Sequence, residues 1–491
     1  RRGPRYLSDW WDGVRDLKSC RKSLSTAFFL YFSILLPTLA FGILNHENTD
    51  GAITVEKGIY AQMMTGLIFG FFGGQPMLII MTTAPFSLYI KVIYSISEDS
   101  DLDFFAFYAW VGIWNAIFLS IYALTEASTL TRFLTRFTKE TFALFICTAF
   151  VVDSTRALAR ELDNNLFNTT TELTYASAVL FFFLLFTVPL AGYWLWSFRD
   201  SIFLHPLVVE LFSDYALPAA VLFATIIGSG LFHLVDLESL PESNQDSWTV
   251  AKMGEVPVWT VFAAMGLGFI LSLLVAIDQN ISAAMANAPE NHLRKGGAYH
   301  WDLLMVAIIN VLLSLFGMPW MNGGIPHSPL HARALADVEL VREGGHLVQR
   351  VVHARETRVA VVCCHVAIGL SVLLVDNVLD LIPESVYYGV FLFLAVTSLP
   401  GNSFYERILL FFTQQSKYPP HSYLRRVPQR VIHFFTIFQL FAYALLCTFG
   451  FVPVDYVQVL YPLSLFSLPF IRYFLAPCFF SKKHIRILDR E

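Results

Sequence analysis

The sequence predicts an all-α protein that crosses a membrane many times. Hydrophobic residues make up 56% of the 491 residues, charged residues only 14%, and the mean hydropathy is +0.57. Apolar runs at 178–196, 257–277 and 359–375 are long enough to cross about 30 Å of hydrocarbon. Prolines interrupt the apolar sequence near residue 80 and near residue 324, which indicates two broken helices.

The polar breaks divide the chain into about fourteen membrane segments. We expect them at 24–44, 57–72, 76–95, 104–125, 139–156, 174–197, 213–233, 257–282, 300–316, 326–338, 358–375, 385–412, 431–451 and 455–478. If the N-terminus is cytoplasmic, most Lys and Arg residues lie on the cytoplasmic side, as the positive-inside rule requires. Both termini are then expected in the cytoplasm. Because the chain begins without methionine, we expect a further cytoplasmic region before it.

Two proline pairs mark the broken helices. Pro76 and Pro85 bracket the first break, and Pro319 and Pro329 bracket the second. Each pair predicts a short extended piece that leads into a half-helix, because proline lacks a backbone donor and clashes with the preceding turn. Lipid tolerates such backbone only where protein or a water-filled cavity covers it. Corresponding breaks in two halves of a chain indicate the central site of a transporter.

Composition and motifs exclude several function classes. A net charge of −5 gives no reason to expect a nucleic-acid partner. The sequence has no nucleotide-binding loop, nucleophile elbow or zinc motif, so we expect neither an enzyme nor a cofactor. Cys363, Cys364 and His365 lie in the middle of an apolar segment, where we expect them to be packing residues and not metal ligands.

Longer strings resemble a known family. They are NAPENHLRKGGAYHWD at 287–302, LFGMPW at 315–320, and LRRVPQR at 424–430 followed by His433. These strings resemble the solute carrier 4 family of bicarbonate and borate transporters, and the resemblance covers almost the whole chain. The stretches 48–51, 82–85, 327–331 and 418–420 look most like its sodium borate transporter-like branch, whose activity is described chiefly as proton or hydroxide conduction.

The resemblance implies an architecture. Fourteen segments form two inverted repeats of seven, segments 3 and 10 are half-helices, and a core domain moves against a gate domain through which the protein forms a homodimer. The implied division is a cytoplasmic N-terminal segment at 1–23, core segments 1 to 4 at 24–128, gate segments 5 to 7 at 129–235, an outer loop at 236–256, core segments 8 to 11 at 257–376, gate segments 12 to 14 at 377–478 and a cytoplasmic tail at 479–491.

A deep carboxylate is the first candidate site residue. Asp278 and Ser282 are four residues apart in segment 8 and so share one helix face. A carboxylate at that depth is costly unless it is paired, hydrated or protonated, which indicates an ion or proton role. The alternative is a helix-end carboxylate at the cytoplasmic interface. The stretch 278–282 resembles that of sodium-coupled carriers, so sodium could bind Asp278, Ser282 and Thr83.

The half-helix starts supply the other candidates. The resemblance puts His327 where chloride exchangers have an arginine, so strong anion binding is not expected; a histidine that only caps the half-helix is the alternative. Ser328 follows it. Thr82 and Thr83 could coordinate sodium, water or ammonia, and simple N-capping is their alternative. We expect His331 to be a mouth residue and not a ligand.

Three functions remain open. The first is electrogenic proton or hydroxide transport, with stimulation by ammonia as a further expectation. The second is sodium-coupled transport of borate or bicarbonate, and the third is a membrane scaffold or adhesion protein, which has no need of two broken helices around a buried carboxylate. The expected partners are membrane lipid, small ions and a second copy of the chain. The resemblance implies the basolateral plasma membrane.

Asn168 begins an N-glycosylation sequon, Asn168-Thr169-Thr170, in a segment expected outside the cell. We predict that Asn168→Gln increases mobility on a gel to the same extent as glycosidase treatment and leaves transport intact, because a sugar there is solvated and remote from the membrane segments. A glycosidase-sensitive band that persists in the variant would contradict this choice of acceptor.

Overall fold

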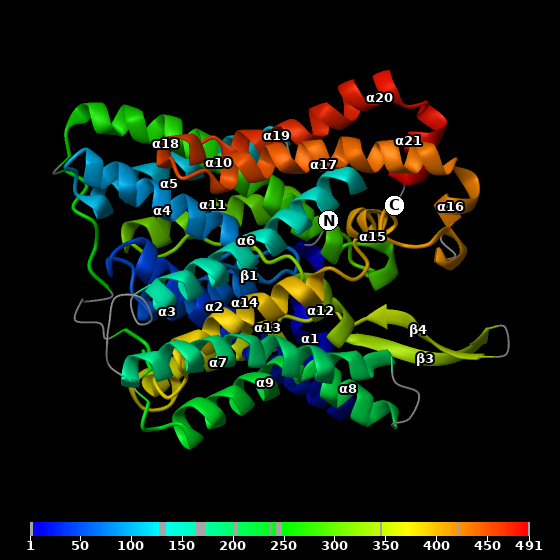
Figure 1. Ribbon diagram of the computed structural model, residues 1–491, viewed down its shortest axis with the longest axis horizontal. Coiled ribbons are helices and arrows are strands. Elements are labelled where there is room, and N and C mark those ends of the chain that lie inside the picture. The colour runs from blue at the N-terminus through cyan, green and yellow to red at the C-terminus, as the bar shows by residue number, and fades with distance from the viewer. Residues whose placement is uncertain are drawn as a thin grey trace.

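The computed structural model describes residues 3–126, 134–163, 172–200, 205–235, 237–241, 248–254, 256–343, 346–419 and 422–489. Asn168 lies outside the described residues, so its predicted glycosylation stays a prediction. The described part is a bundle of helices that run mostly along the long axis of the molecule (Figure 1). Both marked chain ends lie in the half of the bundle that carries a projecting β-hairpin.

The helices and strands have the following bounds. They are α1 (Tyr6–Val14), α2 (Leu17–Asn48), α3 (Val55–Phe72), β1 (Ile80–Met81), α4 (Ala84–Asp99), α5 (Phe104–Leu124), α6 (Arg136–Leu162), α7 (Glu172–Ser197), α8 (Pro206–Asp214), α9 (Ala216–Thr225), α10 (Val258–Ala286), α11 (Tyr299–Leu315), β2 (Asn322–Gly323), α12 (His327–Ala334), β3 (Ala336–Glu343), β4 (His346–Ala354), α13 (Val359–Leu370), α14 (Glu384–Ser398), α15 (Ser403–Leu409), α16 (Ser422–Arg426), α17 (Gln429–Phe451), α18 (Asp455–Gln458), α19 (Tyr461–Phe470), α20 (Ala476–Phe479) and α21 (Lys482–Leu488).

The helices confirm a membrane protein. Within the described residues, seven stretches are long and apolar enough to cross a membrane: 17–48, 104–124, 136–162, 175–197, 258–286, 429–451 and 456–479. Four shorter apolar stretches, at 216–231, 299–315, 359–374 and 384–398, lie among them. Large apolar side chains on these helices stay exposed, as expected of surfaces that face lipid. The count of fourteen segments stays a prediction.

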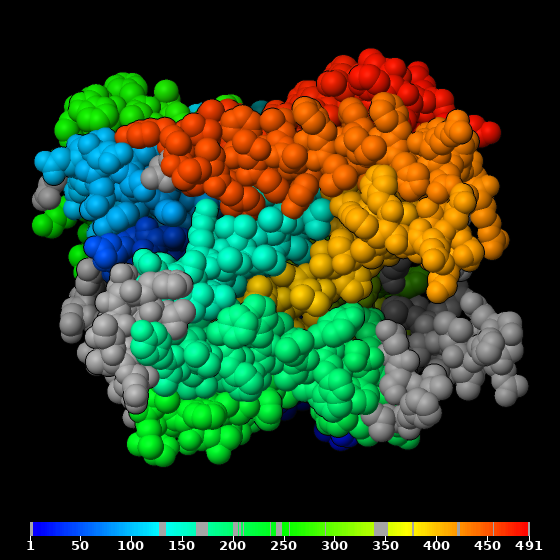
Figure 2. All heavy atoms as spheres, viewed as in Figure 1, coloured from blue at the N-terminus to red at the C-terminus, as the bar shows by residue number. Residues whose placement is uncertain are grey.

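Spatial order differs from chain order. In Figure 2, α6 fills the middle of the visible face, between α17 on one side and α14 and α7 on the other. On the inside of the bundle, α10 packs against α5 and α11 also packs against α5, while α13 packs against α2 and α3. Helices from the first and second halves of the sequence therefore interleave, which buries the two broken segments between them.

The two proline breaks form the predicted extended pieces. The first leads through β1 into α4, which has Pro85 in its first turn, and the second leads through β2 into α12, whose third residue is Pro329. The two pieces pair as a short antiparallel ladder, with Ile80 opposite Gly323. Pairing satisfies backbone groups that would otherwise be orphaned far from water. At both breaks a short extended piece thus leads into a helix, and the assignment of these helices as the half-helices of a transporter stays a prediction.

The all-α prediction is wrong at segment 10. We expected membrane helix over 326–338, but α12 ends at Ala334 and the chain continues into the antiparallel hairpin of β3 and β4. Residues 337–340 alternate charged and apolar types, which is compatible with a strand, but four residues are too few to indicate one firmly. The expected segment at 385–412 is also divided, because the chain turns between α14 and α15 with Gly401 at a positive φ of 84°.

The hairpin is anchored to α2 at its base. The carboxylate of Asp337 accepts hydrogen bonds from Arg355 at 3.0 and 3.2 Å and from Lys22 at 3.4 Å. Arg355 also donates to the hydroxyl of Ser19 on α2. Burial alone would raise the pKa of Asp337, but the hydrogen bonds and charges of Arg355 and Lys22 outweigh it and hold that pKa below its ordinary value. The negative charge of Asp337 therefore fastens the hairpin.

We predict that Asp337→Asn accelerates amide exchange in β4 about fivefold, the change that corresponds to a loss of about 1 kcal/mol. The folded pKa is lowered, so the stabilisation is present near neutral pH and is lost as pH falls through that pKa, below about 4. Hydrogen-exchange mass spectrometry measures it, with Asp380→Asn, at an exposed carboxylate, as the control. Equal exchange in β4 of both variants would contradict the anchor.

Candidate functional site

The site is built on the two paired extended pieces. The side chain of Asn310 on α11 donates to the carbonyl of Met321 and accepts from its amide, both at 3.0 Å, so it pairs with the second piece as a neighbouring strand would. The amide of Gly324 donates to the carbonyl of Ile79 at 2.7 Å and extends the ladder between the pieces. These bonds fix the positions at which α4 and α12 begin.

Asp278 lies beside this ladder and is fully buried. Its Oδ2 accepts hydrogen bonds from Nδ2 of Asn322 at 2.7 Å and from the hydroxyl of Thr83 at 3.4 Å. Its Oδ1 is buried and has no hydrogen-bond partner among the described residues. No Lys or Arg of the described chain forms an ion pair with Asp278. The carboxylate is therefore held by neutral donors and lacks a fixed positive charge.

Two serines connect the same turn of α10 with α12. The hydroxyls of Ser282 and Ser328 lie 3.1 Å apart, and both donate to the carbonyl of Gly324, at 3.3 and 3.1 Å. The hydroxyl of Ser328 also accepts from the amide of Ile79 at 3.1 Å. The predicted residues Asp278, Ser282, Ser328 and Thr83 thus come together around the ladder.

Glycine lets α10 approach this closely. A Cβ on Gly323 would lie 2.7 Å from both Cβ and Oγ of Ser282 and 3.0 Å from Oε1 of Gln279. The amide of Gly323 donates to that same Oε1 at 2.7 Å. Since backbone and helix side chain are in direct contact here, a larger residue must push β2 away from α10 and so move Asn322 relative to Asp278.

The structure places the other two candidates elsewhere. Thr82 donates its hydroxyl to the carbonyl of Trp320 at 3.4 Å, and no hydrogen bond joins it to Asp278. The Nε2 of His327 donates to the carbonyl of Ser33 on α2 at 3.0 Å, and Nδ1 has no partner among the described residues. Neither ring nitrogen bonds Asp278, so no hydrogen bond joins these two candidate residues.

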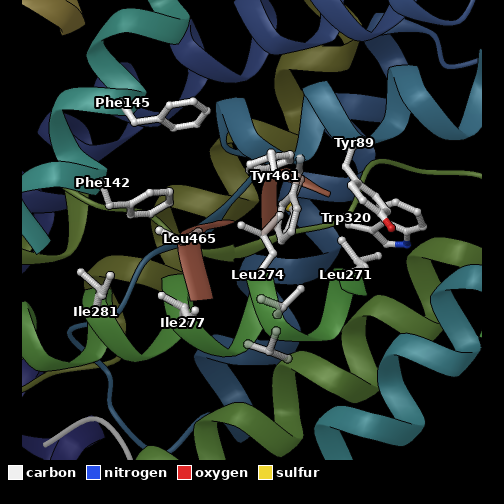
Figure 3. Packing of buried hydrophobic residues seen from close by; sticks show 14 of the residues in the cluster. Tyr89, Phe142, Phe145, Leu271, Leu274, Ile277, Ile281, Trp320, Tyr461 and Leu465 are labelled. Carbon is white, nitrogen blue, oxygen red and sulfur yellow. The ribbon is translucent and has the colours of Figure 1, made fainter. Parts of the chain in front are cut away.

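Aromatic side chains cover the site on one side. Tyr461 of α19 donates its hydroxyl to the carbonyl of Pro85, at the start of α4, at 2.8 Å. Its ring stacks on Phe145 of α6, with centroids 5.9 Å apart. In Figure 3 these rings and Leu465 lie over the face of α10 that carries Ile277 and Ile281. Apolar side chains of α6 and α19 therefore form a layer that covers this face of α10.

Sequence reasoning missed three contributors. Asn322 and Gln279 make the shortest side-chain bonds of the site, and Tyr461 joins it from the far end of the chain. The sequence does carry a signal for Gln279 and Asn322. Both are polar side chains inside an apolar stretch, and buried polar groups require hydrogen-bond partners. No local pattern distinguishes Tyr461 from other aromatic residues.

The arrangement is rich in hydrogen-bond acceptors. Oδ1 of Asp278 and Oδ1 of Asn322 both lack a partner among the described residues. A proton on the carboxylate, or a small cation between such oxygens, would satisfy them, whereas a bound anion would add negative charge beside a carboxylate. The site is therefore suited to a proton or a hard cation.

A family model described as the HCO3- transporter integral membrane domain matches residues 1–179 and 161–491. The chain belongs to this family of bicarbonate transporters. It is 42% identical to solute carrier family 4 member 11 from Homo sapiens and 28% identical to sodium bicarbonate cotransporter 3 from Rattus norvegicus, with all of the chain covered in both. The chain spans 61% and 45% of the length of these relatives.

A structural relative agrees with the family. The transmembrane domain of a cyanobacterium bicarbonate transporter, BicA, is similar with a TM-score of 0.59 at 15% identity, over 87% of this chain and 97% of that one. The family and fold are those of membrane transporters, so the predictions of an integral membrane protein and against an enzyme are confirmed. The identities also agree with the branch that the sequence strings indicated.

We predict that Gly323→Ala lowers transport about tenfold or more while the protein still reaches the cell surface. The added methyl group overpacks the contact between α10 and β2, which typically costs about 1–3 kcal/mol, and moves Asn322 away from Asp278. Transport per surface molecule, from flux and surface biotinylation, is the measurement. Gly254→Ala is the control because nothing lies within 4 Å of a Cβ there. Equal transport by both variants would contradict the close-approach argument.

Proposed function

We propose that this chain is the membrane domain of an electrogenic proton or hydroxide transporter and that Asp278 carries the proton. One observation carries the proposal: a fully buried carboxylate has neutral hydrogen-bond donors on one oxygen, no partner on the other and no ion pair with a Lys or Arg of the described chain. A permanent negative charge in such a place is expensive, and protonation removes it.

The residues at the half-helix starts favour a proton over an anion. Helix N-termini attract anions, and an arginine beside them strengthens the binding of bicarbonate by adding a fixed positive charge and two parallel hydrogen bonds. This chain has His327 there, and its ring is bonded to Ser33 on α2 instead of facing the carboxylate. A proton moving toward the carboxylate and hydroxide moving the other way are electrically equivalent at this site.

Sodium-coupled transport of borate or bicarbonate is the second candidate. The carboxylate of Asp278, Oδ1 of Asn322 and the hydroxyl of Thr83 are hard oxygen ligands of the kind that sodium prefers. Thr83 is also partly exposed, so the site is reachable. The 28% identical relative is named as a sodium bicarbonate cotransporter. Sodium would in this case be cargo and would replace the proton on Asp278.

We also propose the movement and the setting. The two half-helices travel with α10 as a core against a gate that includes α6, α17 and α19, and two copies of the chain associate through that gate in the basolateral plasma membrane. Two extended pieces paired between interleaved helices support an inverted-repeat design of fourteen segments. The position of both chain ends in the same half of the bundle supports an even number of crossings (Figure 1), and the distribution of Lys and Arg supports cytoplasmic termini.

We predict that Asp278→Asn abolishes proton-linked current while surface delivery is largely retained. The amide keeps the volume of the carboxylate but can neither accept the proton nor hold sodium at full strength. Current and intracellular pH are recorded together in expressing cells, with Asp101→Asn, at an exposed carboxylate, as the control. Normal current from surface-expressed Asp278→Asn would remove Asp278 from the mechanism.

The same recordings separate the two candidates. Current and pH change that persist without sodium, bicarbonate and borate support proton or hydroxide transport. Transport that requires sodium together with borate or bicarbonate contradicts the first candidate and favours the second.

A further inference from the structure

The face of α12 that looks toward α2 carries two buried histidines. His327 and His331 are four residues apart, so they share a helix face, and their side chains are 5% and 0% exposed. Because α12 runs from the ladder toward the hairpin, His331 lies one turn nearer the hairpin end of the molecule. Asp278 bonds neither ring.

Each ring has one occupied and one unoccupied nitrogen. Nε2 of His327 bonds the carbonyl of Ser33 at 3.0 Å, and Nδ1 of His331 bonds the carbonyl of Met77 at 3.2 Å. A carbonyl can only accept, so these nitrogens carry the protons and the remaining nitrogen of each neutral ring is an acceptor. Both remaining nitrogens are buried and have no partner in the described part of the chain.

Helix α3 adds two further unpartnered groups. Gln62 donates its amide to the carbonyl of Ile80 at 2.7 Å, and its Oε1 is buried without a partner among the described residues. The hydroxyl of Thr65, on the next turn of α3, is also buried without a partner among the described residues. Met77 and Ile80 are three residues apart, so the carbonyls that bind His331 and Gln62 are separated by at most about 10 Å along the chain. About three water molecules can bridge that distance.

His365 of α13 provides an internal contrast. Its Nδ1 bonds the carbonyl of Val361 at 2.8 Å, and its Nε2 lies 3.1 Å from the amide nitrogen of Gln62, so both nitrogens are occupied. A Cβ on Gly66 would lie 1.8 Å from its ring, which shows how closely that ring is packed. A fully buried histidine in this domain can therefore be satisfied without water, and His327 and His331 are not.

Polar contacts connect this region with the Asp278 site. The amide of Ile79 donates to the hydroxyl of Ser328, which lies 3.1 Å from the hydroxyl of Ser282 on the Asp278 turn of α10. Ile79 lies between Met77 and Ile80, whose carbonyls bind His331 and Gln62. Ser328 and His331 lie three residues apart on α12 and both bond this stretch, so the unpartnered Nε2 of His331 belongs to a side chain one turn along α12 from the Asp278 site.

We propose that His327, His331, Gln62 and Thr65 line a second, hydrated site whose water molecules relay protons between the Asp278 site and the hairpin end of the molecule. The relay role rests on the proposed function, proton transport through Asp278, whereas the hydration of the site does not. In each step, Nε2 of His331 accepts a proton from a hydronium ion, which becomes water, while Nδ1 keeps the proton that it donates to the Met77 carbonyl. The imidazolium then releases the Nε2 proton to the next water, so no group is consumed.

The first experiment measures hydration without transport. Exchange of the C2 hydrogen of histidine for deuterium, followed by mass spectrometry of the purified protein in detergent, requires solvent at the ring. We expect His327 and His331 to exchange about tenfold faster than His365, since only hydrated rings are in contact with solvent. The partly exposed His484 gives the reference for open solvent. Exchange at His331 as slow as at His365 would overturn the hydrated site.

The second experiment tests the relay. His331→Gln keeps a polar side chain but cannot pass a proton, and we expect proton current per surface molecule to fall at least about tenfold. His484→Gln, in the C-terminal segment, is the matched control. Unchanged current in His331→Gln would overturn the relay. Absence of proton current in the unaltered protein would contradict the proposed function instead, and the C2 exchange would still decide whether the second site is hydrated.

Discussion

Two stretches of backbone without helical hydrogen bonds lie inside the bundle, and their need for partners organises the rest of the structure. In lipid, each unsatisfied amide or carbonyl costs several kcal/mol, so a chain with two broken helices must supply substitutes from within. The pieces satisfy part of the need by pairing with one another at Ile80 and Gly323. Side-chain amides supply more: Asn310 pairs with Met321, Gln279 accepts from Gly323, and Gln62 donates to Ile80.

This requirement explains why the centre of an apolar protein is polar. Each amide that completes the backbone brings a second polar atom, and several of these, such as Oδ1 of Asn322 and Oε1 of Gln62, are left without a partner in the described chain. The carboxylate of Asp278 is stabilised by the same scaffold, through Asn322. The groups that hold the breaks in place therefore also carry the unpartnered acceptors on which the proposed proton or cation role depends.

The sequence could predict the parts of this that depend on local chemistry. Proline spacing located both extended pieces, and the presence of a carboxylate four residues before a serine located the Asp278 turn. It could not predict the direction of His327, because a ring at that position can turn toward α10 or α2. The choice depends on which backbone carbonyl is free on a segment that is distant in sequence.

The hairpin of β3 and β4 was missed for a different reason. We expected the residues after the second proline pair to form the rest of a helical segment, and the alternation of charged and apolar residues covers only 337–340, which is too short to indicate a strand by itself.

The side chains of α6 and α19 that cover α10 connect the proposed movement with the Asp278 site. Tyr461 holds the carbonyl of Pro85, and the residue two before that proline, Thr83, donates to Asp278. A displacement of α19 relative to α4 must break or lengthen the Tyr461 bond before it can open the site, and the fully buried hydroxyl then has to find another acceptor. Protonation of Asp278 would weaken its hydrogen bonds with Thr83, at the start of α4, and with Asn322 of β2. The first turn of α4 is thus bonded to Asp278 through Thr83 and to α19 through the carbonyl of Pro85, which gives the proposed movement of α19 a short path to the proposed proton site.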